Sequence, residues 1–261
     1  MYYPPGAGVV ATKVSLSSTL STKLLAHIET SRPYTVIWCG LVSLAGACLT
    51  LQQLPSLSRS LLITFIPMMG WVAGLYLTDF FDRTLDSIQK PHRPIPSGRI
   101  HRYEAVAIGG VVAVLGFSLS FLLNWYNVLL VFPVAVLVFT YAKYTKSRGI
   151  WGNINRGVII IPAFFFGVFA VEPVVSQIPM AIWLFSLVFF LHDTNSNLIG
   201  ALRDVSGDKQ GGYRTLPVKY GMKASVSISI VLCVCYTLII LGLVWWYAPS
   251  VSYTHLTLPT N

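Results

Sequence analysis

The sequence predicts an all-α membrane protein that crosses the bilayer several times, and three observations indicate this class. Hydrophobic residues make up 54% of the 261 residues, charged residues only 10%, and the mean hydropathy is +0.67. Apolar runs close to the roughly 20 residues that a bilayer requires recur along the chain. Basic residues concentrate in alternate connections between these runs. Because lipid offers an open backbone no hydrogen-bond partners, each run is expected to be a helix.

The first segment, residues 1–31, is polar and rich in Ser and Thr. It lacks a basic region followed by an apolar core, so we do not interpret it as a cleaved signal peptide. Four apolar residues in it recur at helical spacing: Leu20, Leu24, Leu25 and Ile28. This spacing favours a short helix at the membrane interface, and a disordered leader is the alternative.

Seven membrane-spanning helices are expected to follow, in a membrane domain over residues 32–248. Their approximate ranges are 34–52, 60–80, 103–122, 126–143, 157–173, 178–200 and 224–247. Basic residues lie before the first span and after the second, fourth and sixth, whereas the other connections carry only Arg59. The positive-inside rule therefore places the N-terminus and the basic connections in the cytoplasm, as in an inner or plasma membrane. The net charge of +9 then requires no nucleic-acid partner.

Two clusters of aspartate mark the cytoplasmic ends of the second and sixth spans. They contain five of the nine acidic residues: Asp79, Asp82, Asp86, Asp204 and Asp208. Spacings of three and four place the members of each cluster on one helix face. Carboxylates this close repel one another at a membrane boundary, so a cation is expected between them. Oxygen ligands favour Mg²⁺, which takes one or two carboxylates and completes its shell with phosphate oxygens and water.

A basic loop containing Arg and Pro follows each aspartate cluster. Residues 90–98 carry Lys90 and Arg93, and residues 212–217 carry Arg214. This recurrence, four spans apart, predicts a pseudo-repeated bundle whose related ends meet at a central cavity. The basic side chains would there bind phosphate oxygens beside the metal. The sequence thus predicts a phosphate-bearing ligand near the membrane surface.

The sixth span carries a polar stripe that continues inward from its aspartates. Helical counting places five residues on this stripe: Asp193, Asn197, Gly200, Asp204 and Asp208. Polar residues at membrane depth favour the wall of a binding pocket. The alternative is a set of hydrogen bonds that only hold helices together.

Taken together, these motifs resemble the UbiA superfamily of intramembrane prenyltransferases. The resemblance covers about residues 33–223 and rests on Asp79-x-x-Asp82-x-x-x-Asp86, Arg93-Pro-Ile-Pro-Ser-Gly-Arg99, Tyr144-x-Lys146-x-Arg148, Gly152-Asn153, Asp204-x-x-Gly-Asp208 and Thr215-Leu-Pro217. It implies a helical bundle that uses Mg²⁺ to transfer a prenyl group from a prenyl diphosphate to a lipophilic or aromatic acceptor. The short gap from Asp86 to Arg93 looks closer to the geranylgeranylglyceryl phosphate and chlorophyll branch than to the 4-hydroxybenzoate branch, and bacterial members of broad aromatic specificity stay open.

The resemblance also implies a role for each matched residue. The five aspartates would bind the metal and act in catalysis, and the substrate would be bound by Lys90, Arg93, Lys146, Arg148, Asn153, Asn197, Lys209 and Arg214. Metal and basic groups would stabilise the charge that develops on the leaving diphosphate. The acceptor would then capture the allylic cation in a dry pocket walled by aromatic helices.

Two departures from the family pattern are visible. Thr78 stands where the family often has Asn before the first aspartate, and the seven expected spans compare with a usual nine. Residues 249–261 are polar and lack a repeating pattern. We expect them to be a non-native, extended tail that packs against nothing and replaces the last two helices.

Two other classes use membrane aspartates. A cation-coupled transporter is the main alternative, although it would not need basic loops beside its carboxylates. A CDP-alcohol phosphotransferase would require a motif that begins Asp-Gly-x-x-Ala-Arg, and the sequence has none.

Overall fold

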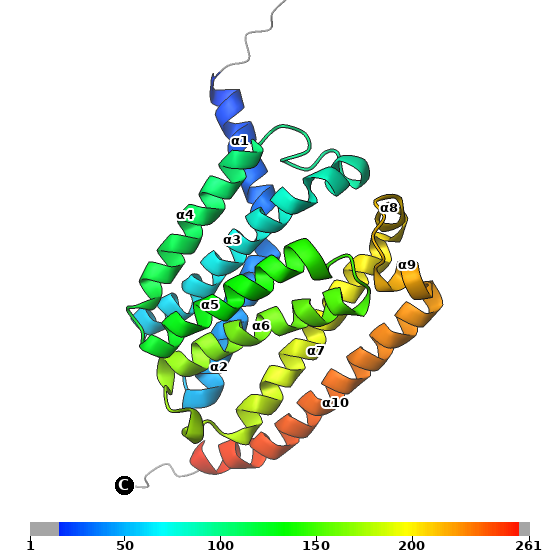
Figure 1. The fold of residues 1–261 in the computed structure, drawn as a ribbon. Helices are drawn as coiled ribbons and strands as arrows, with labels where there is room; N and C mark the ends of the chain where they lie inside the picture. The colour runs from blue at the N-terminus through cyan, green and yellow to red at the C-terminus, as the bar shows by residue number, and fades with distance from the viewer. Residues whose placement is uncertain (1–15, 256–261) are drawn as a thin grey trace, which may run out of the picture.

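The structure, a computed structural model, describes residues 16–255, and this range forms helices and no strand (Figure 1). In chain order the helices are α1 (Leu16–Ser31), α2 (Pro33–Leu51), α3 (Leu57–Gln89), α4 (Arg102–Ser120), α5 (Trp125–Thr140), α6 (Ile150–Val171), α7 (Met180–Arg203), α8 (Val205–Gln210), α9 (Leu216–Tyr220) and α10 (Met222–His255). A π-helical turn, η1 (Tyr141–Thr145), extends α5, and a 3₁₀ turn, η2 (Val175–Gln177), precedes α7. The all-helical prediction is confirmed.

Within the described residues, 6 helical segments are long and apolar enough to cross a membrane. They comprise α2, α3, α4, α5 with η1, α6, and α10 as far as Trp246. The remaining expected span, 178–200, forms the 24-residue helix α7. Its second half carries His192, Asp193 and Asn197, and α7 is not among these six segments because such polar residues lower its hydropathy.

Helix α3 is longer than the expected span 60–80 and carries the first aspartate cluster on its last turns. It contains 33 residues, which correspond to about 50 Å of helix at 1.5 Å per residue. The aspartates therefore lie on a continuous helix rather than in a loop after it. This rigid support fixes the three carboxylates of the cluster relative to one another.

Helix α6 forms the centre of the bundle and packs closely against α2. Its buried side chains include Ile160, Phe164 and Val168, which join Val42 of α2 in the largest apolar cluster. A Cβ atom on Gly167 would overlap the carbonyl oxygen of Ser43, so glycine permits this approach of the two backbones. Small residues serve membrane helices in this way because lipid removes most of the hydrophobic driving force for association.

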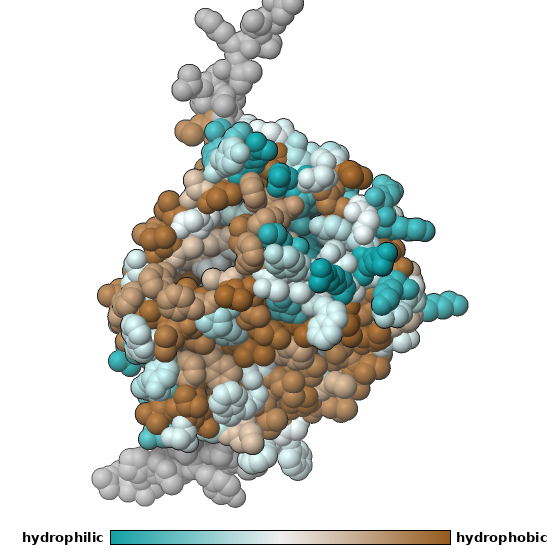
Figure 2. Space-filling view, viewed as in Figure 1, coloured by the Kyte–Doolittle hydropathy of each residue, from teal (hydrophilic) through white to brown (hydrophobic). Residues whose placement is uncertain are grey.

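Polar residues gather at one end of the bundle. Figure 2 shows hydrophilic residues over the end that carries α8 and α9, above flanks that are mostly apolar. The aspartate-bearing end of α3 lies at this end of the molecule (Figure 1). An apolar girdle with one polar end fits an integral membrane protein whose site opens near the membrane surface.

The N-terminal segment contains the expected helix, whereas the start of the C-terminal tail is not extended as expected. Residues 16–31 form α1, on which Leu20, Leu24, Leu25 and Ile28 are exposed, and its position at a membrane interface stays a prediction. Residues 249–255 continue α10 and are therefore helical rather than extended. The rest of the expected tail, 256–261, lies outside the described residues, as do residues 1–15. The non-native origin of this tail also stays a prediction.

Candidate active site

A cavity of about 580 Å³ opens among α2, α3, α4, α5, α6 and α7. Apolar residues such as Leu75, Val138 and Phe166 line its body. Charged residues line its other end, among them Asp86, Arg93, Lys146, Asp204 and Asp208. The cavity thus joins a polar pole to an apolar chamber, which suits a ligand with a charged head and a hydrocarbon tail.

The three aspartates of the first cluster are buried, and each contacts a cationic side chain. Their residues are 5%, 1% and 3% exposed for Asp79, Asp82 and Asp86, respectively. Arg32 pairs with Asp79, and Lys146 pairs with Asp82. The Nη1 atom of Arg93 lies 2.6 Å from Asp86 Oδ2 and 3.9 Å from Asp79 Oδ1. The protein therefore balances this carboxylate cluster with its own basic groups.

The second aspartate cluster, Asp204 and Asp208, is contacted by side chains that come directly after the first cluster in the sequence. Lys90 Nζ donates to Asp204 Oδ2 at 2.6 Å, and Gln89 Nε2 donates to Asp208 Oδ1 at 3.3 Å. Thr215 Oγ1 donates to the other Asp208 oxygen at 3.1 Å. These cross-contacts confirm that the basic loop after α3 lies beside the second aspartate cluster. A Cβ on Gly207 would lie 2.5 Å from Gln89 Cγ, so a small residue allows α8 to approach the end of α3.

The electrostatic environments of the two second-cluster carboxylates differ. Partial burial alone would raise the pKa of Asp204, but the Lys90 ammonium and the Arg203 guanidinium hold it below its ordinary value. Burial raises the pKa of Asp208, and the negative charge of Asp204 adds to the effect. Asp208 is therefore the carboxylate of this pair that lacks a cationic partner in direct contact.

The basic side chains at the polar pole remain charged. Burial opposes the charge of Arg93 and of Lys146, yet the neighbouring carboxylates outweigh it and raise the pKa of each group. Asp86 provides the main stabilisation for Arg93, and Asp82 provides it for Lys146. Both side chains can therefore serve as permanent cations for an anionic ligand.

The donor set fits Mg²⁺ when a diphosphate shares its coordination. The described residues contain no group of three His, Cys, Asp or Glu side chains close enough to hold a metal alone. Mg²⁺ usually takes one or two carboxylates and fills its octahedron with water and substrate phosphate, so a three-carboxylate cage is not required. The available ligands are oxygens, as a hard ion prefers. Asp86, Asp204 and Asp208 line the cavity and can contribute carboxylate oxygens to such a shared site, whereas Asp79 and Asp82 are not among the lining residues.

The structure places the expected substrate residues in different positions relative to the cavity. Lys90, Arg93, Lys146 and Asn197 line the cavity. Asn153 is buried behind it, with its side-chain amide 3.1 Å from that of Asn197. Arg148 and Arg214 instead line a separate surface depression, and Lys209 lines neither space. The substrate-binding roles of all eight residues stay predictions.

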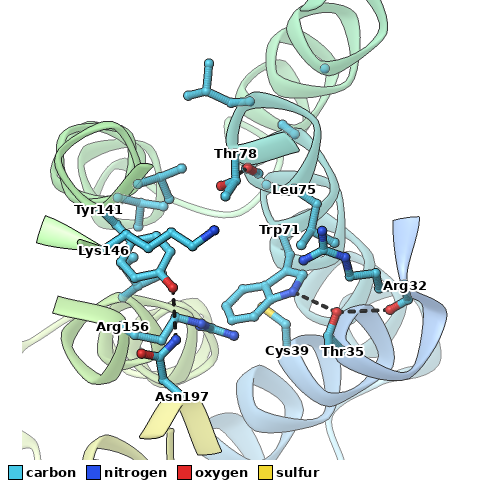
Figure 3. Close-up of a pocket in the computed structure, with 18 of the residues that line it drawn as sticks. Arg32, Thr35, Cys39, Trp71, Leu75, Thr78, Tyr141, Lys146, Arg156 and Asn197 are labelled. Atoms are coloured by element: carbon cyan, nitrogen blue, oxygen red, sulfur yellow. Dashed lines mark hydrogen bonds between the residues drawn. The ribbon is translucent and has the colours of Figure 1, made fainter. Parts of the chain in front are cut away.

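Four of the five residues of the predicted polar stripe line the cavity. Asn197, Gly200, Asp204 and Asp208 are all lining residues. Asn197 Nδ2 donates to the hydroxyl of Tyr141 at 2.9 Å (Figure 3). Asp193, the deepest member, lies behind the wall and is bound by Trp38 and Arg156. The stripe therefore combines a pocket wall with contacts between helices.

Two basic residues of the cavity were missed because sequence reasoning assigned them only to the positive-inside pattern. Arg32 links α1 to α2 with a left-handed backbone, φ 45°, and reaches Asp79. Arg156 lies inside α6 and projects into the cavity (Figure 3). Arg156 directly precedes the apolar run of residues 157–173, and neither this position nor any local pattern identifies the partners of Arg156 and Arg32.

The chain matches the UbiA prenyltransferase family over residues 37–260. It is 30% identical over 200 residues to a digeranylgeranylglyceryl phosphate synthase of Pyrococcus horikoshii, covering 77% of this chain and 70% of that protein. The same named enzyme of Korarchaeum cryptofilum is 31% identical over 201 residues, covering 77% of this chain and 69% of the relative.

Solved structures agree with this match. A digeranylgeranylglyceryl phosphate synthase structure has a TM-score of 0.65 at 28% identity, covering 83% of this chain and 76% of that chain. A UbiA homologue from Archaeoglobus fulgidus bound to GPP and Mg²⁺ shares the fold, with a TM-score of 0.71 at 16% identity over 85% of this chain and 78% of that chain. The chain therefore belongs to the UbiA prenyltransferase family, which makes it a prenyltransferase rather than a cation transporter.

Proposed function

We propose that the polar pole of the cavity binds the prenyl diphosphate and that the apolar chamber holds its chain beside a lipophilic acceptor. The observation that carries this proposal is that Asp86 of the first cluster and Asp204 and Asp208 of the second line one cavity. Lys90, Arg93 and Lys146 line it too, and they pair with Asp204, Asp86 and Asp82, respectively. Asp79, Asp82, Asp86, Asp204 and Asp208 would hold Mg²⁺. When bound, Mg²⁺ supplies positive charge to the diphosphate oxygens as the leaving group departs.

The basic side chains orient the diphosphate and stabilise its developing charge. Lys90, Arg93 and Lys146, which pair with carboxylates in this structure, would donate to the phosphate oxygens of the bound diphosphate. The allylic C–O bond then breaks and its electron pair leaves with the diphosphate. The acceptor nucleophile bonds to the allylic carbon, and the proton that the nucleophile carried passes to the departing diphosphate or to water. Donors fixed on helix ends stabilise this charge without reorganisation at the moment of reaction.

The acceptor is proposed to be a membrane-soluble molecule with a nucleophilic oxygen or carbon. The cavity opens among helices that are otherwise in contact with lipid, so a hydrophobic acceptor can enter from the bilayer. The relatives named as digeranylgeranylglyceryl phosphate synthases support an acceptor built on glycerol. We further propose that the polar pole faces the cytoplasm, where water-soluble diphosphate is released.

The direct test is a transfer assay with the purified full chain in nanodiscs. Radiolabelled geranylgeranyl diphosphate, Mg²⁺ and geranylgeranylglyceryl phosphate should give a labelled lipid product, and EDTA should abolish it. Absence of Mg²⁺-dependent diphosphate release with any lipophilic acceptor would overturn the proposed function.

A further inference from the structure

The cavity has a second polar pole, centred on the guanidinium of Arg156. Arg156 lies on α6 and lines the cavity, and its side chain retains 21% exposure. Its carbon Cζ stacks 4.1 Å above the ring centroid of Trp71 (Figure 3). Arg156 Nη1 donates to Asp193 Oδ2 at 3.0 Å. A guanidinium has five N–H donors, so this bond leaves donor capacity that can face a ligand.

This pole lies well below the diphosphate end. Along α3, Trp71 precedes Asp79 by eight residues, which correspond to about 12 Å of helix rise. Along α7, Asp193 precedes Asp204 by eleven residues, or about 16 Å. A diphosphate held by the aspartates at the end of α3 does not span such a separation. Arg156 is therefore positioned to bind a chemical group other than the diphosphate, which is assigned to Arg93 and Lys146.

The surroundings of Arg156 hold its side chain in place. Trp71 Nε1 donates to Thr35 Oγ1 at 3.2 Å, and that hydroxyl donates to the carbonyl oxygen of Arg32 at 2.9 Å, which fixes the indole ring. Asp193 is 3% exposed and also accepts from Trp38 Nε1 at 3.2 Å. The guanidinium is thus fixed between a carboxylate and an aromatic face before any ligand arrives.

A contribution to the stability of the fold does not by itself explain why Arg156 and Asp193 are paired here. A charged pair at membrane depth carries a desolvation cost, and apolar replacements of buried pairs are often as stable. An ionisable residue inside a membrane bundle that faces a cavity is by default a functional candidate. The charges of Arg156 and Asp193 cancel. An anionic ligand beside them would therefore have no net positive charge to balance its own in the low-dielectric chamber.

We propose that Arg156 binds an uncharged oxygen of the acceptor, a hydroxyl or a carbonyl, and that Asp193 is its positioning residue. This inference rests on the proposed function, because it assigns the acceptor to the chamber below the diphosphate. Trp71 offers an aromatic face beside the same group. The acceptor class is therefore one with a neutral oxygen on an aromatic or aliphatic body that fits this chamber.

The test uses three probes that share one ring system: 2-naphthol, 2-naphthoate and naphthalene. Their dissociation constants are measured by calorimetry on the full chain in nanodiscs, with Mg²⁺ and geranylgeranyl thiodiphosphate present. The wild type should bind 2-naphthol about tenfold more tightly than naphthalene, in line with one charge-assisted hydrogen bond, and 2-naphthoate no better than naphthalene. The double variant Arg156→Met/Asp193→Asn removes both charges together, so no unpaired charge stays buried.

In that double variant the preference for 2-naphthol should fall below about twofold, while the affinity for the thiodiphosphate changes by less than about threefold. Arg156→Lys, which keeps the charge but loses the planar fork, serves if the double variant does not fold and should reduce the preference partially. An unchanged preference, tighter binding of 2-naphthoate, or an equal loss of thiodiphosphate affinity would overturn the inference. Failure of the wild type to bind thiodiphosphate with Mg²⁺ would instead overturn the proposed function.

Discussion

At the scale of single residues, the carboxylates of the site are paired with basic side chains. A metal ion bound by these carboxylates would replace the pairs. Asp82 is 1% exposed and paired with Lys146, so both charges sit where water screens them little. Asp82→Asn keeps the shape of the side chain and removes its charge. We expect Mg²⁺-dependent prenyl transfer to fall by about two orders of magnitude or more, since metal charge stabilisation contributes several kcal/mol. The measurement is product formation under saturating Mg²⁺.

The matched control for this change is Glu172→Gln at the end of α6. Glu172 lies outside the cavity lining and accepts a backbone hydrogen bond from Val174, which glutamine can also accept. Its activity should equal that of the wild type. Near-normal turnover of Asp82→Asn would remove Asp82 from the metal site.

A second residue-scale prediction concerns the diphosphate. Arg93→Ala should weaken binding of a prenyl thiodiphosphate by about 1.5–3 kcal/mol, the range for a hydrogen bond to a charged group. Calorimetry should thus find a dissociation constant about 10- to 150-fold higher. Arg99→Ala is the control, because Arg99 belongs to the same loop but pairs with Glu29 at 2.8 Å. Equal affinities in the two variants would give Arg93 a structural role in its loop.

At the scale of helices, the close packing of α2 on α6 depends on the absence of a side chain at Gly167. Gly167→Ala would place a methyl group on the carbonyl oxygen of Ser43, so α2 must move away from α6. Overpacking of this kind costs about 1–3 kcal/mol. Gly242→Ala in α10 meets no atom within 4 Å and gains helix propensity. Thermal unfolding in detergent should show a lower Tm for the first variant and an equal or higher Tm for the second; the reverse order would show that the interface tolerates a side chain.

The helices and the clustered carboxylates could be predicted from the sequence, whereas the partners of those carboxylates could not. Apolar length predicts α2, α4, α5 and α6 because a bilayer requires it, and motif spacing identifies the clustered carboxylates of α3 and α8. The partners of those carboxylates depend on how distant helices meet. Arg32 reaches Asp79 across 47 positions, and Arg156 reaches Asp193 across 37. No periodicity encodes such pairings, since they arise from packing geometry.

At the scale of the whole molecule, charge is distributed unequally between the two ends of the bundle. The connections at the site end carry Lys90, Arg93, Arg99, Arg148, Lys209, Arg214 and Lys219. The connections at the opposite end, between α2 and α3, α4 and α5, and α6 and α7, carry no Lys or Arg outside the helices. By the positive-inside rule, this asymmetry predicts that the site end faces the cytoplasm.

The orientation can be tested by labelling in cell membranes with an impermeant maleimide. Ser97, between α3 and α4, and Ser176, between α6 and α7, are both exposed and lie at opposite ends of the bundle. In a variant whose four native cysteines are replaced, Ser97→Cys should react in inside-out vesicles only, and Ser176→Cys in right-side-out vesicles only, because the basic end stays in the cytoplasm. Labelling of Ser97→Cys from outside would reverse the orientation. It would also place the diphosphate site on the wrong side for a cytoplasmic prenyl donor.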